Sequence, residues 1–276
     1  MIHLLRRGCA AFGLFTALAV PAIAEPDDDI DRLITLLRFE ETVEIMHLEG
    51  LRYGGEVGRQ LIPDVDEAGW AEDVARLYDT ENMFAVVSND FREELQGADI
   101  GPVVDYFASV EGQEVIASEL AARRVFLDAA AEDAAMARFQ TLEEDDPDLS
   151  AQIAELIDDS DLIEFNVMGT LNASLMFYRG LRDGGAYDAT EDEIFADVWS
   201  QEDDTRQSSA EWLGAFLMVA YEPLDPAQLA AYAALYRTAE GREVNRAIFA
   251  SFDRMYEEIS YLMGRAIGDQ LRSTPL

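Results

Sequence analysis

Cysteine is almost absent from this 276-residue chain, and lysine is absent altogether. The single cysteine is Cys9, so the chain forms no internal disulfide, and catalytic or metal-binding thiolates beyond the N-terminal segment are excluded. Stability must therefore come from a packed hydrophobic core, and a chain of this length can bury one or two.

Positive charge is also scarce. All 20 basic residues are arginine, they face 56 acidic residues, and the formal net charge is −36. Such a charge repels nucleic acid phosphates and anionic lipid surfaces, so we expect no nucleic acid partner. It favours solubility and attracts cations or basic partners. Because the acidic residues are spread along the whole chain, we favour a surface adapted to a salty environment as their explanation.

The first 24 residues have the pattern of a secretory signal peptide. Arg6 and Arg7 precede a short apolar run, Gly8 to Val20, and Ala22 and Ala24 fit the small-residue rule for cleavage. We predict cleavage after Ala24 and a periplasmic or secreted mature protein of 276 − 24 = 252 residues. An uncut N-terminal anchor is the alternative. No later apolar run is long enough to span a membrane, so we expect no membrane insertion after signal removal.

Helical signals dominate the rest of the chain, and the expected fold class is all-α. The chain is rich in alanine, leucine, glutamate and arginine, and alternating strand-like runs are scarce. The clearest stripe of apolar residues, from Val244 to Ala266, has spacings of three and four. The expected helices cover Glu240 to Leu271, Glu111 to Leu142, Leu149 to Leu181, Asp31 to Tyr53, Glu67 to Tyr78, Glu81 to Leu95, Glu191 to Trp199 and Ala210 to Tyr221.

The acidic stretch Glu143 to Asp148 interrupts the helical pattern. Pro147 does not fit deep inside a helix but suits the first position of one. We therefore predict two helical halves, residues 25–146 and 147–276, whose long helices pack into one bundle-like body.

The two halves share sequence phrases, which predicts an internal duplication. Gly50–Gly55 (GLRYGG) returns as Gly180–Gly185 (GLRDGG), 180 − 50 = 130 residues later. Ser109–Val115 (SVEGQEV) returns as Thr238–Val244 (TAEGREV) with an offset of 238 − 109 = 129. Recurrence of such phrases in the same order is typical of repeated units.

Each shared phrase has a structural interpretation. Gly54 and Gly184 are expected just past the end of a helix, because glycine adopts a left-handed conformation without a Cβ clash. Ser109 and Thr238 are expected to cap the next helix through their side-chain oxygens. Gly112 and its counterpart then allow two helix backbones to approach at a corner.

The second phrase, with the amphipathic helix and bulky pair Leu235-Tyr236 before it, resembles the bacterial exported family called domain of unknown function 2059. The chain differs from the family pattern at Gln228, where glutamate is common, and at Ala239, where proline is common. The resemblance covers about forty residues in each half. It implies an all-helical exported domain and no particular activity, and it transfers no functional residue.

No catalytic, cofactor-binding or metal-binding residue is nominated. His47 is the only histidine after the predicted signal peptide, and Phe177 occupies its repeat position, so we interpret it as a partly buried structural residue. A zinc site would need three carboxylates beside it, and phosphate-binding loops and nucleophile-elbow motifs are missing.

Two functions remain open. The favoured one is non-catalytic binding of an envelope protein or an apolar ligand, with no cofactor. Most of a set of nine aromatic residues should be core, and a few could line a groove between the long helices. The set is Trp70, Trp199, Trp212, Tyr178, Tyr221, Tyr232, Tyr236, Tyr256 and Tyr261. The alternative is a carboxylate-dependent hydrolase acting on envelope glycans, which would show a cleft with two carboxyls free of basic partners.

Overall fold

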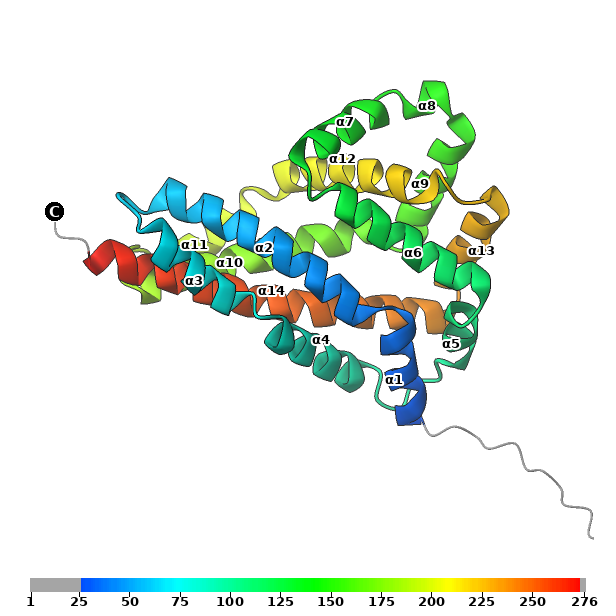
Figure 1. Cartoon of the computed structure of the whole chain (residues 1–276), viewed down its shortest axis with the longest axis horizontal. Coiled ribbons are helices and arrows are strands. Elements are labelled where there is room, and N and C mark those ends of the chain that lie inside the picture. The colour runs from blue at the N-terminus through cyan, green and yellow to red at the C-terminus, as the bar shows by residue number, and fades with distance from the viewer. Residues whose placement is uncertain (1–25, 274–276) are drawn as a thin grey trace, which may run out of the picture.

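The computed structural model describes residues 26–273, and in this range every regular element is a helix (Figure 1). The prediction of an all-α helical bundle is confirmed. The helices are α1 (Pro26–Leu36), α2 (Phe39–Leu61), α3 (Glu67–Leu77), α4 (Thr80–Glu94), α5 (Gly101–Phe107), α6 (Val110–Val125), α7 (Ala129–Phe139), α8 (Leu142–Asp145), α9 (Pro147–Asp159), α10 (Leu162–Asp183), α11 (Glu191–Trp199), α12 (Glu202–Tyr221), α13 (Pro226–Tyr236) and α14 (Ala239–Ser273). The predicted signal peptide and its cleavage position after Ala24 lie outside the described residues.

Helix α14 organises the molecule. Its 35 residues extend for about 50 Å and run along most of the length seen in Figure 1. Of the predicted apolar stripe, Val244, Met255 and Ile259 are buried and three members are half-buried, whereas Leu262 is exposed. The helix packs along α10 and α4. One continuous hydrophobic core joins side chains from Ile30 in α1 to Ile267 in α14, so both predicted halves contribute to the same core.

Helices α10 and α14 run parallel and touch at backbone distance. Phe165 stacks on Phe249 at one end, and Gly184 meets Gly268 at the other, with the same offset of 249 − 165 = 268 − 184 = 84. A Cβ on Gly180 would lie 2.1 Å from the carbonyl oxygen of Tyr261, closer than real Cβ contacts. The glycines are four residues apart and share one face of the helix, which allows this close packing.

Three helices predicted as continuous are each broken in two. The predicted helix from Asp31 breaks at Arg38, and the one from Leu149 breaks at Asp161; both residues adopt positive φ, 52°. The predicted helix from Glu111 to Leu142 breaks before α7, where the Asp128 carboxylate accepts hydrogen bonds from two backbone N–H groups. These predictions were wrong because neither glycine nor proline marks the breaks, which arise from local capping and tertiary packing.

The first glycine phrase does not end a helix. Gly54 lies inside α2, which continues to Leu61, so this half of the prediction is wrong. The second copy does end a helix: α10 stops at Asp183, and Gly184 is its C-cap. The left-handed residue is Gly185, with φ +83°, and not Gly184 as predicted, whose φ is −73°. The N–H groups of Gly185 and Ala186 donate to the carbonyls of Arg182 and Leu181, which is the paired closure of a Schellman motif.

The two predicted corners are confirmed. The hydroxyls of Ser109 and Thr238 accept hydrogen bonds of 3.0 and 2.9 Å from the N–H groups of Gly112 and Gly241. A Cβ on either glycine would lie 2.3 or 2.0 Å from a carbonyl oxygen of the preceding short helix. Pro147 opens α9, as predicted, and the Asp146 side chain caps that helix.

None of the helices in residues 26–273 is both long enough and apolar enough to cross a membrane.

Candidate ligand-binding cavity

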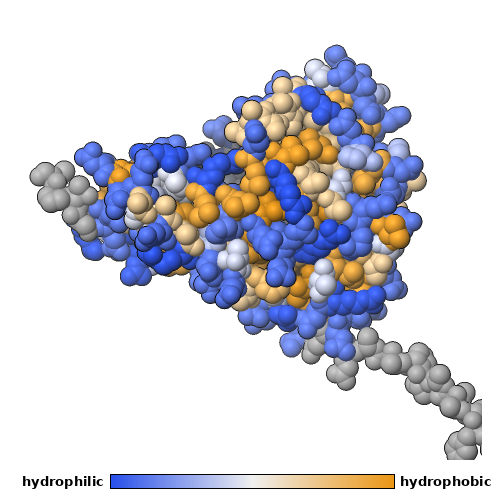
Figure 2. Space-filling model, viewed as in Figure 1, coloured by the Kyte–Doolittle hydropathy of each residue, from blue (hydrophilic) through white to orange (hydrophobic). Residues whose placement is uncertain are grey.

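A cavity of about 890 Å³ lies between the long helices. Stripes of residues from α2, α6, α10, α12 and α14 supply most of its walls. The α14 stripe includes Phe249, Phe252, Asp253 and Tyr256, whose spacing of three and four residues places them on one face. On the face seen in Figure 2, hydrophobic residues gather in the middle, over α2 and α6, within a largely hydrophilic surface.

The cavity opens to solvent. Tyr53, Thr170 and Gln201 line it and are exposed, so they mark its mouth. Deeper in, Ser160 is only 3 % exposed, and its hydroxyl has no hydrogen-bond partner among the described residues. A buried hydroxyl without a partner is unusual in a folded protein.

Most aromatic residues singled out from the sequence line this cavity. The six that do are Trp212, Tyr178, Tyr221, Tyr232, Tyr236 and Tyr256. The other three do not. Trp70 is buried against α2 and donates to the carbonyl of Gly54, Trp199 stacks on Phe195, and Tyr261 donates to Asp183.

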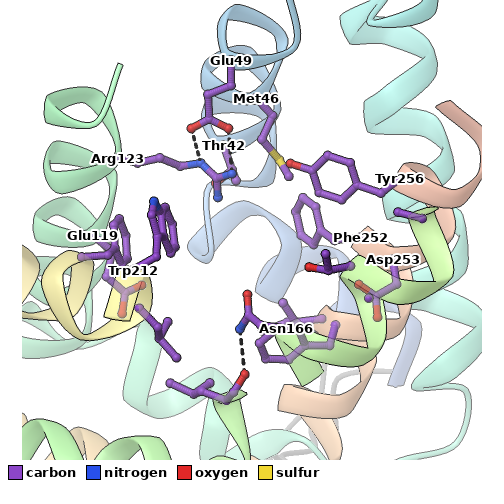
Figure 3. Close-up of a pocket in the computed structure, with 18 of the residues that line it drawn as sticks. Thr42, Met46, Glu49, Glu119, Arg123, Asn166, Trp212, Phe252, Asp253 and Tyr256 are labelled. Carbon is purple, nitrogen blue, oxygen red and sulfur yellow. Dashed lines mark hydrogen bonds and ion pairs between the residues drawn. The ribbon is translucent and has the colours of Figure 1, made fainter. Parts of the chain in front are cut away.

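Three carboxyl groups and one guanidinium are the charged groups in the lining. Glu49 of α2 and Arg123 of α6 form a two-bond ion pair, with both nitrogen–oxygen distances 2.9 Å (Figure 3). The geometry is the paired arrangement that best satisfies both groups. Arg123 is therefore already occupied by a carboxylate.

Glu119 of α6 is held by tyrosine. The Tyr221 hydroxyl donates to it at 2.6 Å, and Tyr232 and Tyr236 join their hydroxyls at 2.8 Å nearby. Burial raises the pKa of Glu119, while the tyrosine hydrogen bonds act in the opposite direction.

Asp253 of α14 has no such support. It makes no hydrogen bond or ion pair with any residue in the described range, and burial, aided by the charge of Glu257, raises the pKa of Asp253 to about 6. In Figure 3 it lies on the opposite side of the view from Glu119 and from the Glu49–Arg123 pair. No sequence pattern distinguishes Asp253 from the other acidic residues, which number 56 in all, although the sequence does place it between aromatic residues of α14.

His47 is half-buried, as predicted, and its Nδ1 lies 2.6 Å from the carbonyl oxygen of Tyr78. Nδ1 therefore acts as the donor. His47 does not line the cavity, and no cluster of three or more potential metal ligands occurs within residues 26–273.

Comparison of the chain with protein-family models, with curated proteins and with solved structures finds no match. The resemblance to the domain of unknown function 2059 family accordingly stays a prediction.

Proposed function

We propose that this protein is a non-catalytic binding protein for a hydrophobic small molecule, exported to the periplasm or the exterior of the cell. The cavity of about 890 Å³, lined mainly by apolar and aromatic side chains, carries the proposal. Its volume is in the range of small-molecule sites, and such sites combine apolar walls with a few placed polar groups.

The walls support a preformed site. Phe39 packs edge-to-face on Phe252 with ring centroids 5.3 Å apart, and Trp212 stacks on Phe216 at 5.3 Å. Rings that are already packed lose little conformational freedom when a ligand binds, so less of the binding free energy is spent on ordering them.

The alternative, a carboxylate-dependent hydrolase of envelope glycans, has one observation in its favour. Glu119 and Asp253 both line the cavity, have no basic partner and have raised pKa values. Against it, Tyr221 occupies Glu119, and a lining dominated by apolar and aromatic groups offers few partners for sugar hydroxyls. Retention of full hydrolysis of glycan substrates by Glu119→Gln and Asp253→Asn would exclude this mechanism, and abolished hydrolysis would support it.

A substitution that fills the cavity with a large side chain tests the binding proposal. Ala173 of α10 lines it, makes no polar contact and can be replaced by tryptophan. Ala250 of α14 is exposed and does not line the cavity, so Ala250→Trp is the matched control. Calorimetric titration with a fluorescent or alkyl hydrophobic probe should give binding to the parent and to Ala250→Trp, and about tenfold weaker binding to Ala173→Trp. Equal binding to all three would place the probe elsewhere and contradict the proposal.

Export and ancestry are parts of the same proposal. The N-terminal pattern supports cleavage after Ala24, which the intact mass of protein recovered from the cell envelope would test, since the mature chain should begin at Glu25. The two capped corners, α5–α6 and α13–α14, support duplication of residues 25–146 and 147–276.

A further inference from the structure

Asp253 is placed where a free carboxylate is costly. It is half-buried, lines the cavity and makes no hydrogen bond or ion pair with any of the described residues. A charge withdrawn from water without a partner is unfavourable unless another group compensates for it. Within the lining, Glu49 has Arg123 and Glu119 has Tyr221, so Asp253 is the one carboxylate left for a ligand.

The neighbours of Asp253 suit a group that only donates hydrogen bonds. The Asn166 amide N–H₂ donates to the carbonyl of Leu162 at 2.7 Å, which leaves its oxygen as an acceptor turned toward the middle of the pocket (Figure 3). A protonated amine has donors and no acceptor, so it can satisfy an amide oxygen and a carboxylate together.

A glycine and two aromatic rings surround Asp253. Gly169 of α10 faces Asp253, and a Cβ there would lie 2.4 Å from the carboxylate oxygen, so the absence of a side chain at residue 169 makes room for the carboxylate. Phe249 and Tyr256 line the cavity one turn before and about one turn after Asp253. Aromatic faces attract cations, and the net charge of −36 draws cations rather than anions toward the protein.

We propose that the ligand is a hydrophobic amine, whose apolar body fills the cavity and whose single protonated amino group binds the Asp253 carboxylate and the Asn166 amide oxygen. This inference rests on the proposed binding function and names the chemical class of its ligand.

Three probes with the same alkyl chain and different head groups test the inference: decylamine, decanol and decanoate, each titrated calorimetrically below its micelle concentration. The amine should bind about tenfold more tightly than the alcohol, because a hydrogen bond to a charged group adds about that factor, and decanoate should bind weakest. Asp253→Asn should remove the preference for the amine and leave the affinity for decanol within about twofold.

Glu258→Gln is the matched control, because Glu258 is an exposed acid on α14 outside the cavity and its loss changes the net charge equally. This variant should keep the preference for the amine. Equal binding of amine and alcohol, or a preference that survives in Asp253→Asn, would overturn the inference while the binding proposal stands. If Ala173→Trp weakens none of the probes, the binding proposal itself fails.

Discussion

In α2, Gly50 and Gly54 face side chains, whereas Gly180 and Gly184, at the end of α10, face the backbone of α14. A Cβ on Gly50 would meet the ring of Tyr78, and one on Gly54 would meet Val74, so α2 and α3 pack antiparallel. A Cβ on Gly180 would meet a carbonyl oxygen in a parallel partner. The same six-residue phrase thus serves two kinds of close packing, and the surrounding structure decides whether the helix ends there.

The largest effect should come from Gly180→Ala. Its Cβ would lie 2.1 Å from the Tyr261 carbonyl oxygen, and relief requires α10 and α14 to separate along their shared face. We expect the free energy of unfolding to fall by about 3 kcal/mol, the upper range for overpacking a core. Urea unfolding followed by circular dichroism measures it. A loss below about 1 kcal/mol would show that the backbones can move apart cheaply.

The matched substitution Gly50→Ala should cost less, about 1 kcal/mol, because a side chain rather than a backbone must shift. A Cβ at Gly50 would lie 2.1 Å from the Tyr78 ring, which lines the cavity. The same unfolding experiment applies. If Gly50→Ala and Gly180→Ala are equally destabilising, the proposed difference between side-chain and backbone contacts is wrong.

The last glycine of each phrase should respond with opposite sign. Gly55 lies inside α2, where the only atom near an added Cβ is in the Arg59 side chain at 3.6 Å, so Gly55→Ala should stabilise the protein by about 0.5–1 kcal/mol. Gly185 has φ +83°, so Gly185→Ala should destabilise it by about 1 kcal/mol. Thermal melts of the two variants in one buffer would check the signs, and a shared sign would contradict the assignment.

A further comparison concerns Gly169 of α10 and Asp253, which faces it, where we expect a smaller effect on stability. Burial raises the pKa of Asp253 from 3.8 to about 6. Ionisation of Asp253 therefore opposes folding once the pH exceeds the pKa of aspartate in the unfolded chain. Asp253→Asn should raise the melting temperature by a few degrees near pH 7.5 and by less near pH 4, where the carboxyl is protonated in the folded protein. The exposed Glu258→Gln provides the control. A gain that does not change with pH would show that the charge of Asp253 is well solvated.

The sequence was most informative where one pattern covers many turns or where a cap is local. The apolar stripe located α14, and the Ser109 and Thr238 caps located both corners. The breaks at Arg38 and Asp161 were not predictable, because left-handed conformations at residues other than glycine are imposed by tertiary packing.

The cavity was foreseen only as a possible groove between helices. Its walls come from five long helices that are distant in sequence. The amino-acid composition does not reveal whether the space between such helices is filled by side chains. Asp253 is selected by lacking a partner, which only the arrangement of its neighbours reveals.

The backbone contact between α10 and α14 has a mechanical consequence. Neither helix can slide or bend away without breaking the contacts at Gly180, Gly184, Gly264 and Gly268. We therefore expect the wall that carries Asn166 and Asp253 to keep its spacing. We expect α2, α6 and α12, on the other side of the cavity, to be the helices that move when a bulky ligand enters. Amide hydrogen exchange should accordingly be slow in α10 and α14 and faster in α2, α6 and α12.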